Sequence, residues 1–260
     1  MPKEVIPASS NQTAEKLLQV MEALAYQSKP VKLIDLAHEL HMNSSTLYRF
    51  LTALQNQGYI IQQEKSGEYS LNFKLCYLAE LVRRHSSIVS ILHPAVVRIS
   101  DLFQEAAHLA QEEDHRIVYV DNVAATSQTL TIRQYIGKTA PMHCTGVGKL
   151  LLLEYSEEEL EQLITAQGLP QYTAFTCTTR ESLYKELENV RTAGYAFDNE
   201  ECEIGVRCIA VPVRNHTGKI VAGLSVSGPT TRLTDAVVEE KLPSLLEIAK
   251  QASRDLGHIE

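Results

Sequence analysis

The sequence predicts an α+β protein with a small helical N-terminal domain and a larger domain built on an antiparallel sheet. Apolar residues recur at helical spacing between positions 12 and 54, and strand-like runs alternate with turns and helices beyond position 105. The chain has 260 residues, 44% of them hydrophobic and 22% charged. This is the length and composition of two ordinary globular domains.

Three helices are predicted at the start of the N-terminal domain. The first covers about 12–27, with apolar side chains three and four residues apart on its inner face. Residues 32–54 then form two short amphipathic helices separated by a tight break. Asn43 or Ser44 is the expected N-cap of the second helix of this pair.

A short hairpin is predicted to follow these helices. The strand-like runs 59–62 and 68–71 flank Gly67, which tolerates the positive φ that a tight turn requires. Three helices followed by a hairpin make a winged helix-turn-helix, which we place over residues 12–72. In such a module the second helix of the pair enters the major groove of DNA.

The outer face of that second helix suits a DNA groove. Its apolar residues fall on the inner side, which leaves a hydroxylic and singly basic face outside. Arg49 is the candidate for a phosphate or guanine contact, and Lys65 at the hairpin tip could touch phosphate. The predicted DNA-contacting residues are Ser44, Ser45, Thr46, Tyr48, Arg49, Thr52 and Lys65.

The net charge of −8 argues against nucleic-acid binding only when it is averaged over the whole chain. Residues 1–74 hold equal numbers of basic and acidic side chains, so the whole excess of negative charge lies in the remainder. A neutral N-terminal domain attached to an acidic remainder is consistent with DNA binding through the N-terminal domain alone. Because the N-terminal domain carries no net positive charge, we expect modest affinity per copy and useful binding only from a dimer.

A linker helix is predicted between the two domains, over residues 73–90. Leu71, Leu75, Leu78 and Val82 recur at helical spacing, so this helix either packs on its own domain or pairs with its copy in a dimer. Pro94 is expected in the first turn of a helix over about 93–105. This start marks an effector-binding domain over 91–260, and residues 1–11 are predicted to be a disordered tail.

The C-terminal domain is predicted to be an antiparallel sheet flanked by helices. Gly194 is the expected C-cap of one helix, and Asn215 to Gly218 form the turn between the last two strands. The predicted strands are 107–112, 116–123, 129–135, 195–199, 207–214 and 220–227. The predicted helices are 147–154, 157–167, 180–193 and 235–257.

A polar, glycine-containing loop at residues 137–149 precedes an apolar helix. Free backbone N–H groups at the start of that helix could bind an anion, or the segment could be a plain loop with Thr145 as N-cap. It is not a phosphate-binding loop of the GxxxxGK[ST] type. His143 occupies the required first glycine position, and Leu150 replaces the hydroxyl residue that would hold magnesium.

Two further segments could contribute to a ligand pocket. The acidic run 198–203 is either a solvated face or the place where Asp198 and Cys208 point into one cavity. Ser225 and Ser227 share one face of an apolar strand, where their hydroxyls must bond either to the backbone or to a polar ligand.

Several kinds of site and location are disfavoured. The five cysteines lack metal-ligand spacing, so we expect reduced thiols, no structural metal and no cofactor. His143 and Cys144 are neighbours on an extended chain and therefore point apart, which gives no basis for a catalytic pair. The sequence contains neither a signal-peptide pattern nor a membrane-length apolar run, so we expect a cytoplasmic protein.

Taken together, these motifs resemble the IclR family of bacterial transcriptional regulators over almost the whole chain. Four blocks carry the resemblance: 45–51 with Gly58-Tyr59, 142–149, 194–213, and 223–229 with Arg232. The resemblance implies a winged helix that binds operator DNA, a linker helix in the dimer contact, and a GAF-like sensor domain. It implies a homo-oligomer, either a dimer or a dimer of dimers, and no enzymatic activity.

The resemblance also implies a small carboxylate or 2-oxo acid as effector. The carboxylate would meet the backbone around Thr145, and side chains of the later strands would complete the pocket. The effector-binding residues implied are Thr145, Gly146, Val147, Asp198, Cys208, Ser225, Val226 and Ser227. The run 194–213 is similar to the sugar-acid-sensing branch, so a 2-keto-3-deoxy sugar acid stands beside a glyoxylate-like acid as a candidate.

Two positions depart from the family pattern. Ser44 stands where a lysine or another polar residue is common, which leaves the operator sequence open. Gly146 stands where alanine is common, which could widen the anion loop or change how closely a ligand approaches. Two alternative functions remain: an enzyme that uses the acidic and thiol groups, and a protein–protein adaptor. Repression and activation are equally compatible with the sequence.

Overall fold

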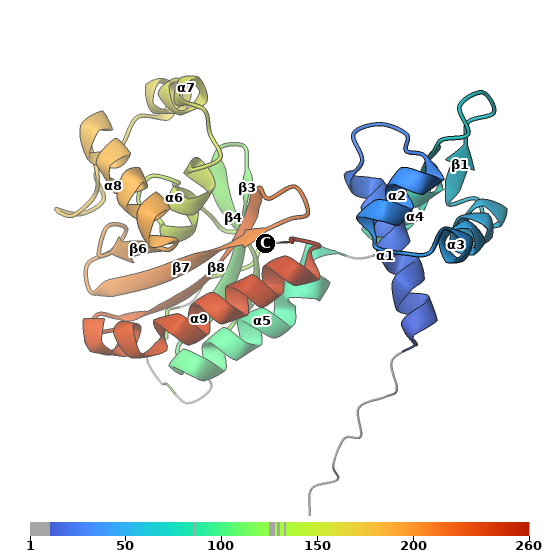
Figure 1. Ribbon diagram of the computed structural model, residues 1–260. Helices are drawn as coiled ribbons and strands as arrows, with labels where there is room; N and C mark the ends of the chain where they lie inside the picture. Colours follow the sequence, from blue (N-terminus) through green and yellow to red (C-terminus); the bar gives the residue numbers. More distant parts are fainter. Residues whose placement is uncertain (1–10, 86, 125–127, 129–130, 133, 260) are drawn as a thin grey trace, which may run out of the picture. The chain divides into compact units, whose positions relative to one another are not determined.

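The computed structural model describes residues 11–85, 87–124, 128, 131, 132 and 134–259, and the chain divides into two units after residue 86 (Figure 1). Each unit is described by itself. The tail predicted for 1–11 lies outside the described residues except for Asn11. The Asn11 side chain accepts a hydrogen bond from the Ala14 N–H and caps the first helix.

The N-terminal unit has the predicted order of three helices, a hairpin and a further helix. Asn43 is the N-cap of the second paired helix, because its side chain accepts a hydrogen bond from the Ser45 N–H at 3.0 Å. Gly67 has a φ of +70° in the hairpin turn, as the sequence predicts. The elements are α1 (Gln12–Tyr26), α2 (Leu33–Glu39), α3 (Ser44–Asn56), β1 (Ile60–Gln62), β2 (Tyr69–Leu71) and α4 (Lys74–His85).

The predicted inward faces of α1, α2 and α3 meet in one apolar core with the hairpin. Its fully buried members include Val20, Leu36, Leu47 and Leu51.

The start of α4 is tied to the same domain. The Lys74 ammonium donates to the Gln57 carbonyl at 2.6 Å and lies 4.4 Å from the centre of the Tyr59 ring. The winged helix-turn-helix prediction is confirmed. Pairing of α4 with a second copy stays a prediction, and the Val82 side chain lies outside the described part.

The C-terminal unit is built on a six-stranded antiparallel sheet with the strand order β5-β4-β3-β8-β7-β6. Helices α5 (Ile88–Phe103) and α9 (Asp235–Asp255) cover one face, and the shorter helices cover the other (Figure 1). The strands are β3 (Ala106–Glu113), β4 (Arg116–Val123), β5 (Thr139–Ala140), β6 (Ala196–Asn199), β7 (Val206–Arg214) and β8 (Ile220–Pro229). The remaining helices are α6 (Gly146–Leu152), α7 (Glu157–Gln167) and α8 (Arg180–Ala193).

Three predicted elements differ from the structure. The linker helix expected over 73–90 is α4, which ends at His85. The helix expected from position 93 begins at Ile88, because the Ser87 hydroxyl accepts a hydrogen bond from the Ser90 N–H and caps it there. Pro94 therefore lies inside α5 and not in its first turn. A strand was expected over 129–135. Residues 129, 130 and 133 lie outside the described part, the rest of that segment is not in a strand, and the edge strand is β5 instead.

Strand β8 separates the two apolar layers of the unit. Leu224 and Val226 pack toward α5 and α9, while Ser225 and Ser227 project from the opposite face, as strand alternation requires. Gly223 allows α6 to approach that opposite face, since a Cβ there would lie 2.6 Å from Val147 Cγ1. The start of α6 is thus held directly against the sheet.

Candidate functional site

A cavity of about 300 Å³ opens on the α6 side of the sheet. Three of the predicted effector-binding residues, Thr145, Asp198 and Cys208, lie in its wall. The other polar residues of the wall are Arg116, Tyr119, Gln134, Lys138, Thr139, Tyr172, Cys202 and Glu203. The structure therefore brings together groups from the segments before α6, after β6 and at the start of β4.

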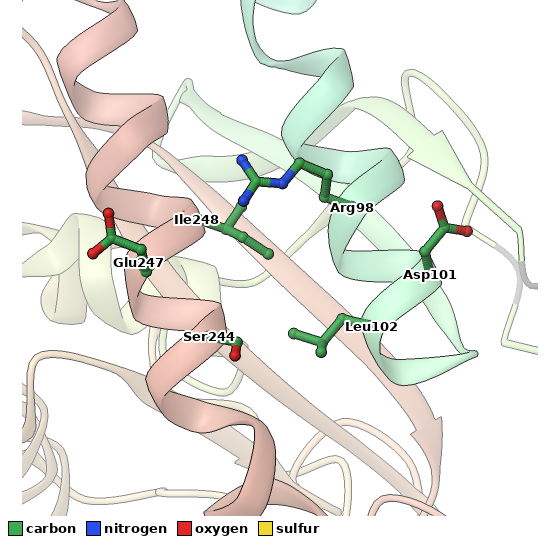
Figure 2. Close-up of a pocket in the computed structure, with 6 residues that line it drawn as sticks. All are labelled: Arg98, Asp101, Leu102, Ser244, Glu247 and Ile248. Carbon is green, nitrogen blue, oxygen red and sulfur yellow. The ribbon is translucent and has the colours of Figure 1, made fainter. Parts of the chain in front are cut away.

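A larger hollow of about 510 Å³ lies elsewhere, on the surface between α5 and α9. Figure 2 shows Arg98 and Leu102 projecting from α5, and Ser244 and Glu247 from α9. It contains none of the predicted site residues and no buried polar side chain. We therefore take the smaller cavity at Asp198 as the candidate site.

Asp198 organises the acidic run around itself. It is buried at the end of β6, and its Oδ1 accepts the backbone N–H groups of Glu201 at 2.8 Å and Cys202 at 3.2 Å. Burial raises the pKa of the Asp198 carboxyl above its usual value, although these hydrogen bonds oppose the rise. Glu201 is buried as well, so the interpretation of the run as a solvated face holds only for exposed members such as Glu203.

The β6–β7–β8 register links Asp198 to the two serines. Cys208 lies opposite Asp198 on one side and opposite Ser227 on the other. The Ser227 hydroxyl donates to the Cys208 sulfur at 3.0 Å, so it lies behind the cavity wall. Ser225 lies two residues further along the same buried face, outside the wall residues. The Val226 side chain packs on the α5 face of the sheet and is not brought to the cavity.

Thr145 is the N-cap of α6. Its hydroxyl accepts a hydrogen bond from the Gly148 N–H at 3.2 Å and donates to the Pro141 carbonyl at 2.7 Å. Gly146 and Val147 follow in the buried first turn. A wider anion loop or a closer ligand approach at Gly146 stays a prediction. A Cβ at this position would point to the sheet, 3.0 Å from the Ala210 Cβ, so the glycine sets the distance between helix and strand.

Lys149 holds the site together, a role that the sequence analysis missed. Its side chain is fully buried, and its ammonium donates to Glu186 Oε1 at 3.0 Å, to the Phe197 carbonyl at 2.9 Å and to Glu201 Oε1. It therefore joins α6, α8 and β6 to the acidic run. A lysine inside the apolar helix sequence GVGKLLL was the signal that could have revealed it.

The charges around Lys149 are unevenly matched. Burial alone would lower the pKa of Lys149, but the carboxylates of Glu201 and Glu186 outweigh it and raise that pKa, so the amine is charged. Burial raises the pKa of Glu201 to about 7 despite the pull of Lys149, and the charges of Asp198 and Glu186 add to the rise. The single positive charge of Lys149 is thus shared among the carboxyl groups of Glu186, Asp198 and Glu201.

The cysteines and histidine of the site are not arranged as a catalytic pair. His143 Nε2 lies 3.1 Å from the Pro170 carbonyl, whereas the Cys144 sulfur lies 3.3 Å from the Cys202 sulfur. The hydrogen bond to Cys144 and burial raise the pKa of Cys202, and burial raises that of Cys208. Cys202 and Cys208 are therefore neutral thiols, the opposite of the thiolate that a nucleophile requires.

Two cations on the cavity wall were also missed. Arg116 begins β4, where its Nε donates to the Thr139 hydroxyl at 3.1 Å, and Lys138 lies just before β5. Tyr119 lies in the same wall, and burial raises the pKa of its hydroxyl. These residues approach Asp198 only because the sheet folds, so no motif in the sequence indicates them.

Among the described residues, no cluster of three or more histidine, cysteine or acidic side chains could hold a metal ion. Every helix in this part of the chain is too short or too polar to cross a bilayer.

The predicted DNA-contacting residues lie on α3 and in the hairpin turn of the N-terminal unit. Ser44, Ser45, Tyr48 and Arg49 are exposed on α3, and Lys65 is exposed in the hairpin turn. Thr46 and Thr52 are half-buried on the same helix. The Thr52 hydroxyl donates to the Tyr48 carbonyl at 2.8 Å, and the Ser45 hydroxyl donates to Asn43 at 2.8 Å.

Comparisons with known proteins agree with this arrangement. Two family models match, the IclR helix-turn-helix domain over residues 13–64 and the bacterial transcriptional regulator IclR C-terminal domain over 81–257. The HTH-type transcriptional regulator KdgR of Escherichia coli is 32% identical over 245 residues, which is 94% of this chain and 92% of the relative. The transcriptional repressor IclR of the same species is 29% identical, over 95% and 90% of the two chains.

Solved structures of the family share the fold. The crystal structure of IclR from Thermotoga maritima matches with a TM-score of 0.62 and 31% identity, covering 95% of this chain and 99% of that one. Sequence, domain order and fold all agree with the same assignment. The chain belongs to the IclR family of bacterial transcriptional regulators, with a helix-turn-helix DNA-binding domain and a C-terminal effector domain.

Proposed function

We propose that this chain binds operator DNA through α3 as a dimer or a dimer of dimers, and that a small carboxylate in the C-terminal cavity controls the binding. The observation that carries the proposal is the cavity at Asp198, where cationic and buried acidic groups meet in the effector domain of a family of DNA-binding regulators. The effector would act by binding DNA-competent and incompetent arrangements with different affinity.

The DNA contacts are assigned to the exposed face of α3. Arg49 reads a guanine or holds a phosphate, and Ser44, Ser45, Thr46, Tyr48 and Thr52 contact phosphate or base edges beside it. Lys65 at the wing tip neutralises a phosphate. In a symmetric dimer two such helices would read half-sites separated by about one or more helical turns.

Replacing Arg49 with alanine is expected to raise the dissociation constant for operator DNA roughly five- to hundredfold, since one guanine or phosphate contact is lost. Fluorescence anisotropy at physiological salt, with duplexes selected by the wild-type protein from a random library, measures this change. Arg98→Ala is the matched control, because Arg98 is an exposed arginine of the C-terminal unit. Unchanged operator affinity in Arg49→Ala would remove Arg49 from this role.

The effector is assigned to the class of small carboxylates, with a glyoxylate-like 2-oxo acid and a 2-keto-3-deoxy sugar acid as candidates. Arg116 and Lys138 supply positive charge for the carboxylate, and the backbone at Thr145, Gly146 and Val147 offers hydrogen bonds, as the family resemblance implies. Asp198 and Cys208 contact the rest of the effector. The Ser227 hydroxyl donates a hydrogen bond to the Cys208 sulfur and so holds Cys208 in place. A volume of about 300 Å³ is at the small end of ligand pockets.

Replacing Asp198 with asparagine is expected to weaken effector binding tenfold or more, because a hydrogen bond to a buried carboxyl group is lost (roughly 1.5–3 kcal/mol). Asparagine keeps the Oδ1 acceptor for Glu201 and Cys202, so the acidic run should stay folded. Thermal shifts with small 2-oxo acids and sugar acids measure the change, and Asp101→Asn on the surface of α5 is the control.

Three outcomes of that measurement separate the functions. A ligand that raises the midpoint of the wild type and of Asp101→Asn, but raises that of Asp198→Asn less, supports the sensor. Equal shifts in all three proteins would contradict the assignment of Asp198. An absence of any shift, with DNA binding intact, would favour the protein–protein adaptor.

Catalysis is not part of the proposal. An enzyme of this pocket would need an activated nucleophile, and the raised pKa values of Cys202 and Cys208 oppose one. We further propose that the regulator acts in the cytoplasm, and as a repressor, which is how the relative IclR of E. coli is named.

A further inference from the structure

Two cysteine thiols meet beside the candidate cavity of the C-terminal unit. The Cys144 sulfur lies 3.3 Å from the Cys202 sulfur, although the two residues are 58 positions apart in the chain. The Cys202 sulfur also lies 3.2 Å from the Cys144 carbonyl oxygen, to which its thiol can donate. A disulfide bond is about 2.0 Å long, so the sulfur atoms need to approach by only about 1 Å to be joined.

The two thiols differ in how an oxidant can reach them. Cys202 is half-buried and belongs to the cavity wall, whereas Cys144 is completely buried and is not a wall residue. A molecule as small as hydrogen peroxide fits into a cavity of about 300 Å³ and reaches the pair from the side of Cys202. Cys144 then supplies the second thiol.

A bond between these cysteines would join two parts of the candidate site. Cys144 directly precedes Thr145, the N-cap of α6. Cys202 belongs to the acidic run, and its N–H donates to Asp198 Oδ1 at 3.2 Å. Closing the gap between the sulfur atoms therefore draws the acidic run toward the start of α6, and both segments line the cavity.

We propose that Cys144 and Cys202 form an oxidative modification site, at which a hydroperoxide converts the two thiols into a disulfide that lowers the affinity for the effector. The inference goes beyond the proposed function, because it gives the effector domain a second input. Formation of the bond depends only on the two sulfur positions and on access from the cavity, whereas its effect on the effector rests on the proposed function.

The oxidation balances with one peroxide molecule for each pair of thiols. The Cys202 sulfur attacks one peroxide oxygen, the O–O bond breaks, and the released hydroxide leaves as water with the thiol proton. The Cys144 sulfur then attacks the sulfenic acid formed on Cys202, the S–O bond breaks, and a second water leaves with the Cys144 proton. Two electrons pass from the two thiols to the peroxide, and no other oxidant is needed.

The surroundings make the first step slow and the second step fast. The hydrogen bond to Cys144 and burial raise the pKa of Cys202, so little of the reactive thiolate is present near pH 7. Once Cys202 is oxidised, the Cys144 sulfur attacks within one molecule and does not have to diffuse. The site should therefore respond to prolonged exposure to peroxide, and thiol reductants should reverse the modification.

Mass spectrometry of the full chain after treatment with hydrogen peroxide tests for the bond. Every protein carries Cys76→Ser, because Cys76 is exposed and could join two chains. This parent protein is expected to lose two hydrogen atoms and to regain them with dithiothreitol. Proteolysis of the oxidised protein should yield a peptide pair linked through Cys144 and Cys202.

Three variants separate this pair from the other thiols. Cys144→Ala and Cys202→Ser should each form no internal bond, and alanine adds no polar group at the buried position. Cys177→Ser, at a half-buried cysteine before α8, is the control and should form the bond to the same extent as the parent protein. A peptide pair that links Cys202 to Cys208, or oxidation of Cys202 to a sulfinic acid with no link, would overturn the assignment.

Isothermal titration with glyoxylate and with 2-keto-3-deoxy-D-gluconate measures the effect on the effector site. The acid that binds the reduced parent protein should bind the oxidised protein roughly fivefold or more weakly, since the acidic run has moved. The same treatment of Cys144→Ala should change its dissociation constant by less than about twofold. Equal affinity before and after the bond forms would contradict the regulatory part of the proposal.

The two proposals fail in different ways. If the linked peptide pair forms but neither acid binds the reduced protein, the proposed effector class is wrong and the modification site stands. If an acid binds and no link forms under peroxide, the modification site is wrong and the proposed effector site stands.

Discussion

Replacing Lys149 with methionine is expected to lower the free energy of unfolding by about 3–5 kcal/mol. Methionine fills much of the space of the lysine stem but leaves two carboxylates and a backbone carbonyl without their shared donor. Those groups are Glu186, Glu201 and the Phe197 carbonyl. An uncompensated buried charge costs far more than a lost surface ion pair.

The cost should depend on pH, through Glu201. The pKa of Glu201 is about 7 in the folded chain and 4.5 as an ordinary carboxyl. Between these two pH values the folded state holds a proton that the unfolded state has lost. The contribution of Glu201 to the free energy of unfolding therefore falls as pH rises from about 4.5, and in the wild type this fall ends near pH 7. Without Lys149 the pKa rises further and the fall continues, so the penalty of Lys149→Met should grow between pH 7 and 9.

Urea denaturation of the two proteins at several pH values measures both effects. Lys185→Met is the matched control, because Lys185 is exposed on α8. Adding Glu201→Gln to Lys149→Met should recover part of the loss, since the double variant no longer buries that unpaired charge. A penalty below about 1 kcal/mol, or one that shrinks above pH 7, would contradict this account of the network.

Replacing Gly148 with alanine is expected to cost about 2–4 kcal/mol, although the same change stabilises most exposed helices. A Cβ at this position would lie 2.3 Å from the Met142 carbonyl oxygen and 2.4 Å from the Met142 Cα. It would also lie 2.5 Å from the Thr145 hydroxyl oxygen that caps α6. Backbone atoms cannot swing aside as a side chain can, so the first turn must move and the cap weakens.

Gly146→Ala is the matched control in the same helix. Its Cβ would meet the Ala210 Cβ at 3.0 Å and the Ala196 carbonyl oxygen at 3.1 Å, which needs a shift of only a few tenths of an ångström. We expect a cost below about 1 kcal/mol there. Thermal and urea unfolding of both variants test the contrast, and a Gly148→Ala protein as stable as Gly146→Ala would refute the close approach at Met142.

Local patterns in the sequence were sufficient for most secondary-structure elements. Helices α7 and α8 have the predicted bounds, because Ser156 and Thr179 cap their starts and Gly194 ends α8 with a φ of +78°. Caps, turns and apolar spacing act over a few residues, so they can be read before the fold is known. The predicted start of α5 is wrong because Pro94 suggests a first turn near residue 93, whereas the Ser87 cap begins the helix at Ile88.

The site depended on contacts between distant segments. The pairing of Asp198 with Cys208 is confirmed, because neighbouring strands bring them together, but Arg116 and Lys138 come from β4 and the chain before β5. Which residues share a cavity depends on strand order and register, and neither is encoded in a local pattern.

The sequence by itself therefore determined the family and the winged helix, and it predicted the residues that α3 would present to DNA. The tertiary structure alone decided that Lys149 is buried among carboxylates, that Gly146 faces the sheet, and that Arg116 and Lys138 line the candidate cavity. The physical reason is that a helix or turn is stabilised by its near neighbours in the chain. Burial, pKa and unsatisfied hydrogen bonds arise only when segments far apart in sequence close around one another.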